Sequence, residues 1–355
     1  MAVGEGSVVS TRLIAYDMLS SSFARHAPRM VRTIFGLSAM AALSACASAR
    51  STGTAAAAIP ARARAARGAT AVLASLDTLV REPREAVIQR ELRAGNIPSF
   101  LRTLHTVRDS ATASDGRLHV IEYDVMPDYL AVGDDTDFVR MPMTPHTAQA
   151  FANAYGYVLP TRRMVNAIWR AATVKLEPQP LTEAREASRT FLQHHRLIEA
   201  QLVGASRRAL VAGIKKDVVV SNRLLERANR VAIYGWHHQN GVPIQPLYVG
   251  HVDWYVDYSH GIRLVRRTMR VDGAPMSFEQ IATHPVLHVL VSDEGELETT
   301  RADGELRFGF TTRGELREGN YGRGTTGGEL REGNYGRGTT RGELREGNHG
   351  RATTG

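Results

Sequence analysis

The sequence predicts an α+β fold, with segregated helices packed on a mainly antiparallel sheet in a single main domain at residues 71–298. Some segments alternate polar and apolar residues with the period of a strand, and others repeat apolar residues at helical spacing. The helical segments gather ahead of most strands without regular strand–helix–strand alternation. That order favours a segregated α+β arrangement over a doubly wound sheet.

The helices are indicated by caps and by spacing. Thr144 and Pro145 have the pattern of an N-cap followed by a first-turn proline, and apolar residues then recur on one helical face as far as Gly156. Pro160 and Thr161 open a second helix in the same way. Helices are therefore expected over 71–94, from Thr144 to Gly156, from Pro160 to Ala172, and around 189–202.

The strands are indicated by β-branched and aromatic runs bounded by turn residues. Residues 117–126, "RLHVIEYDVM", alternate most clearly, and Asp272-Gly273 has the composition of a turn. Strands are expected at 117–126, 129–133, 216–222, 230–236, 262–271 and 288–292.

The basic charge of the chain lies outside the predicted domain. The whole chain has a formal net charge of +8, yet residues 95–298 carry 22 basic and 22 acidic side chains. Residues 1–94 carry 12 basic and 6 acidic side chains, and residues 299–355 carry 10 and 8. A neutral domain without a basic tract argues against a nucleic-acid partner.

The N-terminal region has the pattern of a secretion signal. Residues 30–46 combine Arg32 with a short apolar run and end in "LSAC", which resembles the lipobox of bacterial lipoproteins. The resemblance implies cleavage before Cys46 and a lipid on its sulfur, which would anchor the protein to a membrane. The alternative is a buried apolar helix with an incidental cysteine. Residues 1–29, which precede the signal, are interpreted as an incorrect translation start.

Two further segments flank the domain. Residues 47–70 are rich in Ala, Arg, Ser and Thr without apolar periodicity, and are predicted to be a tether. Residues 299–355 contain three near-identical copies of a 14-residue unit, beginning at positions 311, 325 and 339. Each copy has a single leucine, too little apolar surface to offset the entropy of ordering, so a disordered tail is expected.

The stretch "GHVDWYVDYSHGIRL" at 250–264 concentrates titratable and aromatic residues. If it is extended, its side chains alternate between two faces. One face would hold His251, Asp253, Tyr255 and Asp257; the other would hold Val252, Trp254, Val256 and Tyr258. We therefore expect an apolar face in the core, with a cost of about 3–5 kcal/mol for Trp254→Ala, and a polar face that is either a solvated sheet surface or the wall of a site.

The polar face suggests hydrolytic chemistry. A carboxylate beside an imidazole orients the ring and raises its basicity, so His251, Asp257 and His260 are the catalytic candidates. His251 and Asp253, about 6.7 Å apart at Cα in a strand, could share a metal ion with His260, and zinc is the expected ion. Candidate substrate-binding residues are Tyr255, Trp236 and Lys216.

Other side chains are expected to have ordinary roles. Cys46 is the only cysteine, so the domain has neither a disulfide nor a thiol nucleophile. Ser221 is best explained as a turn residue at a strand end. His194 and His195 are expected at the surface of a polar helix, and Trp169 in the core.

The span from residue 120 to residue 293 resembles secreted bacterial proteins of unassigned function, through "MPMTPHTAQ" and "LPTRRM". This resemblance supports a single domain and implies no reaction. The signal and the polar stretch at 250–264 together favour a lipid-anchored hydrolase at the periplasmic or extracellular face of the cell envelope. Its substrate would be an envelope polymer such as peptidoglycan. The alternatives are a non-catalytic envelope or carbohydrate-binding lipoprotein, and a serine- or aspartate-based hydrolase without metal.

Overall fold

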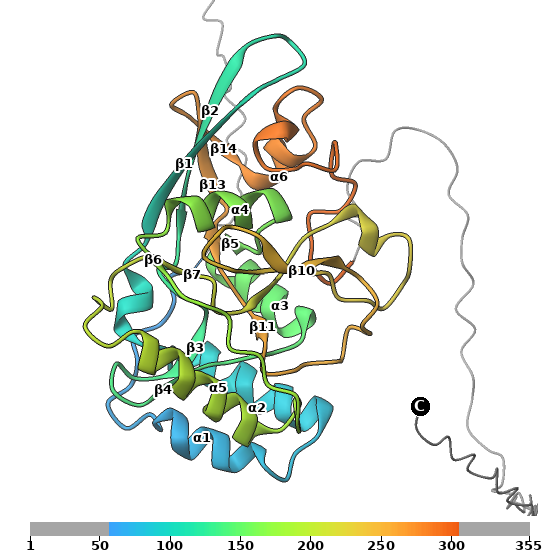
Figure 1. Cartoon of the computed structure of the whole chain (residues 1–355). Helices are drawn as coiled ribbons and strands as arrows, with labels where there is room; N and C mark the ends of the chain where they lie inside the picture. Colours follow the sequence, from blue (N-terminus) through green and yellow to red (C-terminus); the bar gives the residue numbers. More distant parts are fainter. Residues whose placement is uncertain (1–56, 305–355) are drawn as a thin grey trace, which may run out of the picture. The chain divides into compact units, whose positions relative to one another are not determined.

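The computed structural model describes residues 57–304, which fold around two main sheets (Figure 1). The larger sheet has six strands in the order β14-β13-β2-β12-β5, with β1 also paired to β2. All of its pairings are antiparallel. Its strands are β1 (His105–Thr112), β2 (Leu118–Val125), β5 (Tyr157–Val158), β12 (Val265–Arg266), β13 (Thr268–Val271) and β14 (Ala274–Ser277).

The second sheet carries the segments that matter for function. Its order is β10-β9-β8-β11, and the β8–β11 pairing is parallel while the other two are antiparallel. These strands are β8 (Lys216–Val218), β9 (Ile233–His237), β10 (Pro243–Tyr248) and β11 (His260–Gly261). Two short pairs complete the strands: β3 (Ala131–Gly133) with β4 (Phe138–Arg140), and β6 (Val174–Lys175) with β7 (Val211–Ala212).

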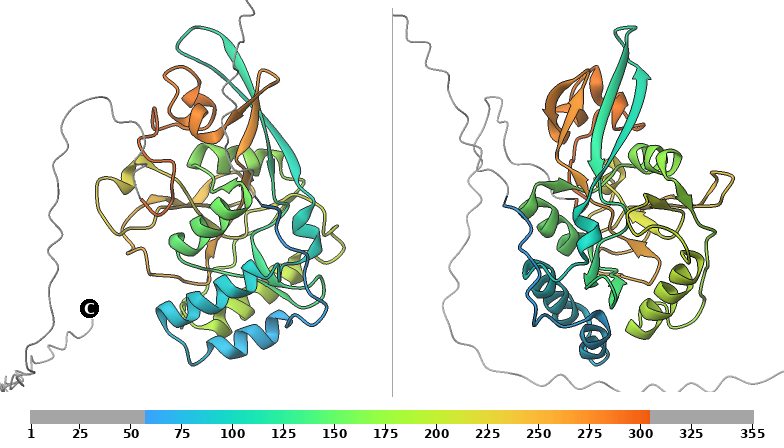
Figure 2. Two further views of the ribbon diagram at one scale, coloured as in Figure 1. Left: turned by 180° about the vertical axis from the view of Figure 1, so that it is seen from behind. Right: turned by 90° about the vertical axis from the view of Figure 1, so that its left-hand side faces the viewer.

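Three helices form one end of the domain: α1 (Ala69–Leu76), α2 (Arg81–Arg93) and α5 (Ser188–Gln201). In every view they lie at the end opposite the tip of the long β1–β2 hairpin (Figures 1 and 2). The remaining helices pack closer to the sheets: α3 (Pro145–Tyr155), α4 (Arg162–Ala171) and the short α6 (Phe278–Ala282). Within residues 57–304, short 3-10 helices occur at Ser99–Arg102, Asn222–Leu224 and Leu287–Leu290.

The α+β prediction is confirmed, and the local signals account for several elements. The Thr144 hydroxyl accepts the backbone N–H of Thr147 at the start of α3, and Gly156 ends that helix at φ 72°. The Thr161 hydroxyl caps α4 in the same way, accepting the N–H of Met164. Asp272 and Gly273 both have positive φ between β13 and β14, as a tight hairpin turn requires.

Two strand predictions need correction. Residues 288–292 were expected to form a strand, but Leu287–Leu290 is a 3-10 helix. Residues 262–271 were expected to form one strand, but they contain two short ones, β12 and β13. Strand β12 pairs with β2 and β5, and β13 pairs with β2 and β14. Apolar β-branched runs of this length do not distinguish a strand from other buried segments by composition alone.

The chain packs beyond both predicted edges of the domain. Within the predicted tether, Arg62 donates to the Asn96 side chain at 2.8 Å, and α1 starts at Ala69. On the other side, Ala302 is fully buried and its N–H donates to Gln149 at 2.9 Å. The predicted signal, Cys46, the first part of the tether and the tail repeats lie outside the described residues.

One hydrophobic cluster runs through most of the domain, from α1 to the last described residues. Buried charge accompanies it: Arg140, 1% exposed, pairs with Asp128 at 2.6 Å and with Glu199 at 2.9 Å. In the described part of the chain, no helix combines the length and apolar character needed to cross a membrane.

Candidate functional site

The stretch at 250–258 does not form the expected strand. Val252 makes an isolated antiparallel bridge with Arg230, Asp253 and Trp254 form a turn, and Tyr255 to Asp257 are irregular. The predicted division into two faces is therefore wrong. Trp254, expected in the core, is 45% exposed, whereas Asp257, expected on the polar face, is fully buried.

The stretch then enters the second sheet through β11. His260 lies beside Lys216 and Gly261 beside Asp217 in the parallel pairing with β8. A side chain could not replace Gly261, because a Cβ atom there would lie 2.6 Å from the ring of Tyr129 and 2.8 Å from the Cβ of Lys215. The backbone of β11 therefore lies close against the side chains of Tyr129 and Lys215.

Asp257 is the centre of a buried hydrogen-bond network. Its Oδ1 accepts the N–H of Ser259 at 2.8 Å and the Ser259 hydroxyl at 2.5 Å. Its Oδ2 accepts Nη2 of Arg185 at 2.6 Å and the Tyr255 hydroxyl at 3.2 Å. Burial raises the pKa of Asp257, but His260, Ser259 and Arg185 lower it by more, so the pKa is well below its ordinary value. Asp257 is therefore a carboxylate at neutral pH.

His260 lies behind this network. It is 1% exposed, and its Nε2 atom has no hydrogen-bond partner among the described residues. Burial lowers the pKa of His260 to about 4, although Asp257 acts in the opposite direction. The ring is consequently neutral at pH 7 and lacks direct contact with solvent.

His251 occupies the outer side of the same cluster. Its ring stacks on Tyr255 with centroids 4.4 Å apart, and its centroid is 6.2 Å from that of His260. His251 is half-buried, and burial lowers its pKa below the ordinary value of 6.5. The structure thus brings together the three predicted catalytic residues, His251, Asp257 and His260, and the predicted substrate-binding Tyr255.

The predicted metal ligands do not come together. Asp253 pairs with His146, at 2.9 Å from carboxylate oxygen to Nε2, instead of turning toward His251 and His260. Across residues 57–304 no group of three or more His, Cys, Asp or Glu side chains is arranged to hold a metal ion. The residues present do not fit zinc at this place.

The two other predicted substrate-binding residues, Lys216 and Trp236, differ in solvent exposure. Lys216 is half-buried, and burial lowers its pKa below 10.5. Trp236 is only 2% exposed, so its indole packs inside the domain and cannot serve as a surface for a polymer. The Lys216 ammonium lies 5.8 Å from the centroid of that indole.

Some buried titratable residues near this region were predicted wrongly or were not identified as partners of the cluster. His194 and His195, expected at the surface, are 0% and 7% exposed. Lys215 is buried beneath the stretch; its ammonium donates to the backbone carbonyl of Tyr258, and burial lowers its pKa to about 7. Arg185, the ion-pair partner of Asp257, lies 72 residues earlier in the chain, so no local pattern could have identified it.

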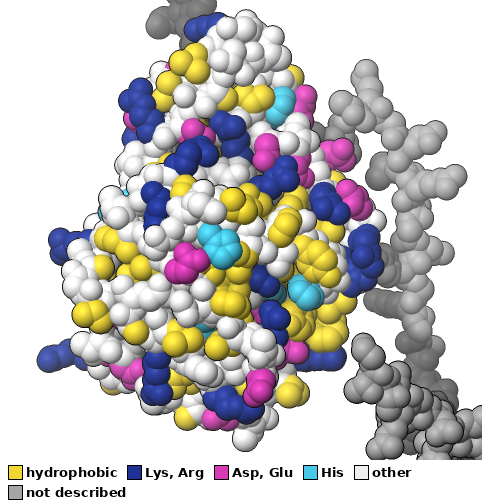
Figure 3. Space-filling model, in the orientation of Figure 1, with side chains coloured by type: hydrophobic (Ala, Val, Ile, Leu, Met, Phe, Trp, Pro, Cys, Tyr) yellow, Lys and Arg dark blue, Asp and Glu magenta, His cyan; other side chains and the backbone are white. Residues whose placement is uncertain are grey.

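Two other sequence interpretations can be compared with the structure. The Ser221 hydroxyl accepts the N–H of Arg223 and donates to Glu294 at 2.8 Å, as a turn residue would. Trp169 packs against the core but is only partly buried. On the face in Figure 3, acidic and basic side chains are interspersed, and histidines lie beside hydrophobic side chains.

Comparisons of this chain with protein-family models, with curated protein sequences and with solved structures found no match.

Proposed function

We propose that this protein is a lipid-anchored hydrolase of a cell-envelope polymer such as peptidoglycan, with His251 as its general base. The observation that supports this is the cluster of His251, Tyr255, Asp257 and His260 beside Lys216. Titratable side chains with shifted pKa values in contact with one another are typical of catalytic sites.

His251 is suited to accept a proton. Its half-buried ring is accessible from the surface, and its lowered pKa keeps the imidazole neutral at pH 7. In the proposed reaction, His251 takes a proton from water while the water oxygen attacks the acyl carbon of the substrate. The same proton then passes from His251 to the leaving nitrogen as the carbon–nitrogen bond breaks.

Lys216 would stabilise the negative charge that develops on the substrate oxygen. Its positive charge contributes to the lowered pKa of both His251 and His260, so its ammonium is within electrostatic range of both rings. A fixed cation of this kind stabilises the transition state more than the ground state, because the oxygen is charged only in the former.

Asp257 and Arg185 would act by positioning. The Asp257 carboxylate is fully buried and accepts hydrogen bonds from Arg185, Tyr255 and Ser259. The network holds Tyr255 through its hydroxyl, and Tyr255 in turn stacks on His251. Asp257 therefore controls the orientation of the base without contacting the substrate.

The proposed location follows from the predicted lipid on Cys46, which would keep the domain at the envelope beside its polymer. A Cys46→Ser protein should then move from membrane to soluble extracts, because the thioether needs sulfur. If this variant still fractionates with membranes, the anchor is not on Cys46.

Digestion of purified envelope polymer, with mass spectrometry of the products, tests the proposed activity. The wild-type chain should release defined fragments and His251→Ala should not. His238→Ala provides a matched control, because His238 is also half-buried but pairs with Glu177 outside the cluster. Equal product release by His251→Ala would overturn the role of His251.

A non-catalytic carbohydrate-binding protein is the second candidate. The observation that favours it is Trp254, which is 45% exposed next to the cluster, since exposed aromatic rings commonly stack on sugars. Retention of the protein on envelope polymer without any released product would favour this alternative.

A further inference from the structure

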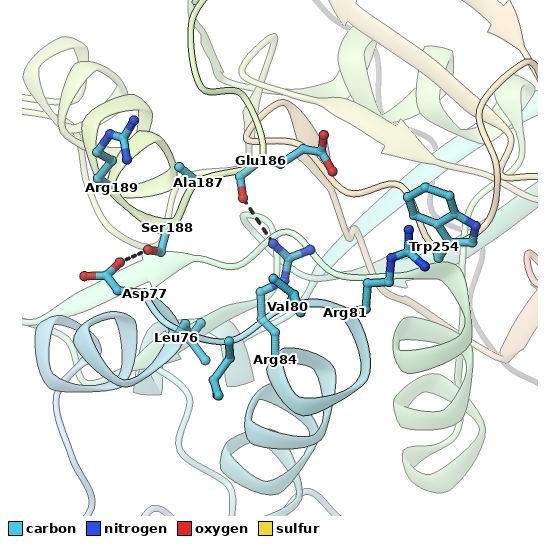
Figure 4. A pocket seen from close by; sticks show the side chains of 11 residues that line it. Leu76, Asp77, Val80, Arg81, Arg84, Glu186, Ala187, Ser188, Arg189 and Trp254 are labelled. Atoms are coloured by element: carbon cyan, nitrogen blue, oxygen red, sulfur yellow. Dashed lines mark hydrogen bonds between the residues drawn. The ribbon is translucent and has the colours of Figure 1, made fainter. Parts of the chain in front are cut away.

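Residues next to the cluster in the chain help to line a pocket of about 740 Å³, whose side chains are shown in Figure 4. The link between α1 and α2, the start of α5 and Trp254 form its walls. It adjoins the proposed active site at two points of the chain, because Glu186 follows Arg185 and Trp254 precedes Tyr255. Its volume is within the range of small-molecule sites, about 300–1,000 Å³.

Arg84 projects into this pocket. The side chain is 9% exposed, its Nη1 donates to the backbone carbonyl of Glu186 at 3.1 Å, and its buried Nε has no hydrogen-bond partner among the described residues. No ion pair to Arg84 exists within residues 57–304. A buried guanidinium without a counter-charge is costly, and a bound anion would supply that charge.

Two helices begin at the pocket with arginines in their first turns. Helix α2 starts at Arg81 and includes Arg84, and α5 starts at Ser188 followed by Arg189. Neither helix has a side-chain N-cap. The N-terminus of a helix carries partial positive charge, to which these arginines add. Glu82 in the first turn of α2 and Asp77 beside Ser188 offset part of it, and neither forms an ion pair with Arg84.

Trp254 supplies an aromatic surface on the same pocket. The guanidinium of Arg81 lies 4.1 Å from the indole centroid and fixes the ring, which remains 45% exposed. Arg81 itself has φ 44°, a left-handed conformation that is strained for a residue other than glycine. Strain of this kind concentrates at functional sites.

We propose that this pocket binds an acidic saccharide, whose anionic group pairs with Arg84 and whose ring lies against Trp254, while Arg189 adds positive charge at the edge of the pocket. The assignment as a substrate subsite rests on the proposed hydrolase function, but the binding itself does not depend on it. The acidic polymer would then extend from this pocket toward His251.

The polar groups of the pocket favour a sugar over a polyphosphate. Asp77 and Glu186 also line it, and the Asp77 carboxylate accepts the Ser188 hydroxyl. These acceptors suit the hydroxyl groups of a saccharide that carries one anionic group. A ligand with several phosphates would bring repeated negative charge against both carboxylates.

Isothermal titration calorimetry with the full chain tests the proposal with two probes, N-acetylmuramic acid and N-acetylglucosamine. They share a ring, and only the former has a carboxylate. The acid should bind at least about tenfold more tightly, as a charge-assisted hydrogen bond of about 1.5–3 kcal/mol implies. Arg189→Gln should reduce this preference, because it removes a positive charge from the edge of the pocket, and its exposed side chain makes the change compatible with folding.

Arg196→Gln is the matched control, because Arg196 is an exposed arginine on the same helix that does not line the pocket. It should bind both sugars as the wild type does, whereas Trp254→Ala should weaken both. Equal affinity for the two sugars, an Arg189→Gln protein whose preference for the acid is unchanged, or tighter binding of adenosine monophosphate or inorganic phosphate than of the acidic sugar would overturn the proposal.

The two proposals can fail separately. Acid-selective binding without polymer digestion would support the proposed saccharide-binding pocket and contradict the proposed hydrolase function. Polymer digestion without acid-selective binding would support the hydrolase function and contradict the proposed pocket.

Discussion

His251 and His260 belong to one cluster but have different surroundings, and the difference separates their roles. His260 is fully enclosed, with its ring edge against Tyr255 at a centroid distance of 5.8 Å. His251 also contacts Tyr255, but it is half-buried and so reaches the surface. Only His251 can meet a polymer without a rearrangement of the domain, so we assign the proton transfer to it and a positioning role to His260.

The exposure of the tryptophans predicts opposite effects of truncation. Trp236→Ala should lower the free energy of unfolding by about 3–5 kcal/mol, because it removes a fully buried indole. Trp254→Ala should cost less than half as much, because its indole is 45% exposed. Urea denaturation of the two variants measures both values. A larger loss for Trp254→Ala would place that side chain in the core.

At the scale of the elements, a helix N-cap that also bonds to another part of the fold should contribute more to the free energy of unfolding than a cap that serves its helix alone. The Thr161 hydroxyl caps α4 and donates to the carbonyl of Val291. Thr161→Ala should cost about 2 kcal/mol, the upper end for an N-cap, and Ser277→Ala about 1 kcal/mol, because Ser277 caps only the short α6. Thermal unfolding of both variants checks this order, and equal losses would contradict it.

The elements that the sequence predicted well depend on neighbours in the chain. Helices α3 and α4 begin where a threonine can cap them, and the β13–β14 turn forms where Asp272 and Gly273 accept positive φ. The stretch at 250–258 depends on distant and competing contacts instead. The Asp257 carboxylate accepts the N–H of Ser259, which draws the backbone away from a strand. Its partner Arg185 comes from the segment before α5, so the alternating pattern alone could not predict a loop.

The sequence predicted only those features of the candidate site that depend on residues close together in the chain. Clustering in the sequence placed His251, Tyr255, Asp257 and His260 near one another, and the structure keeps them together. The metal assignment required Asp253 to share a strand face with His251. The turn at Asp253 and Trp254 removes that geometry and brings Asp253 to His146.

At the scale of the whole molecule, the folded domain extends further than its predicted C-terminal edge. Truncation after Gly304 should leave the melting temperature nearly unchanged, because each repeat has a single leucine. Truncation after Thr300 should lower it by about 4 °C or more, because Ala302 is buried and hydrogen-bonded to Gln149. Calorimetry measures the melting temperature of both truncated proteins. A large fall in the melting temperature after truncation at Gly304 would mean that the repeats stabilise the domain.

The rate of product release as a function of pH tests the roles of His251 and Lys216 most directly. His251 must be neutral to accept a proton, so the rate should fall on the acid side, with a midpoint below 6.5 because burial lowers its pKa. Lys216 must be charged, so the rate should fall again on the alkaline side, with a midpoint below 10.5. Lys216→Arg should move the alkaline midpoint upward, because arginine stays charged throughout this range. An acid midpoint above 6.5, or an alkaline midpoint that is unchanged in Lys216→Arg, would contradict a site built on these two side chains.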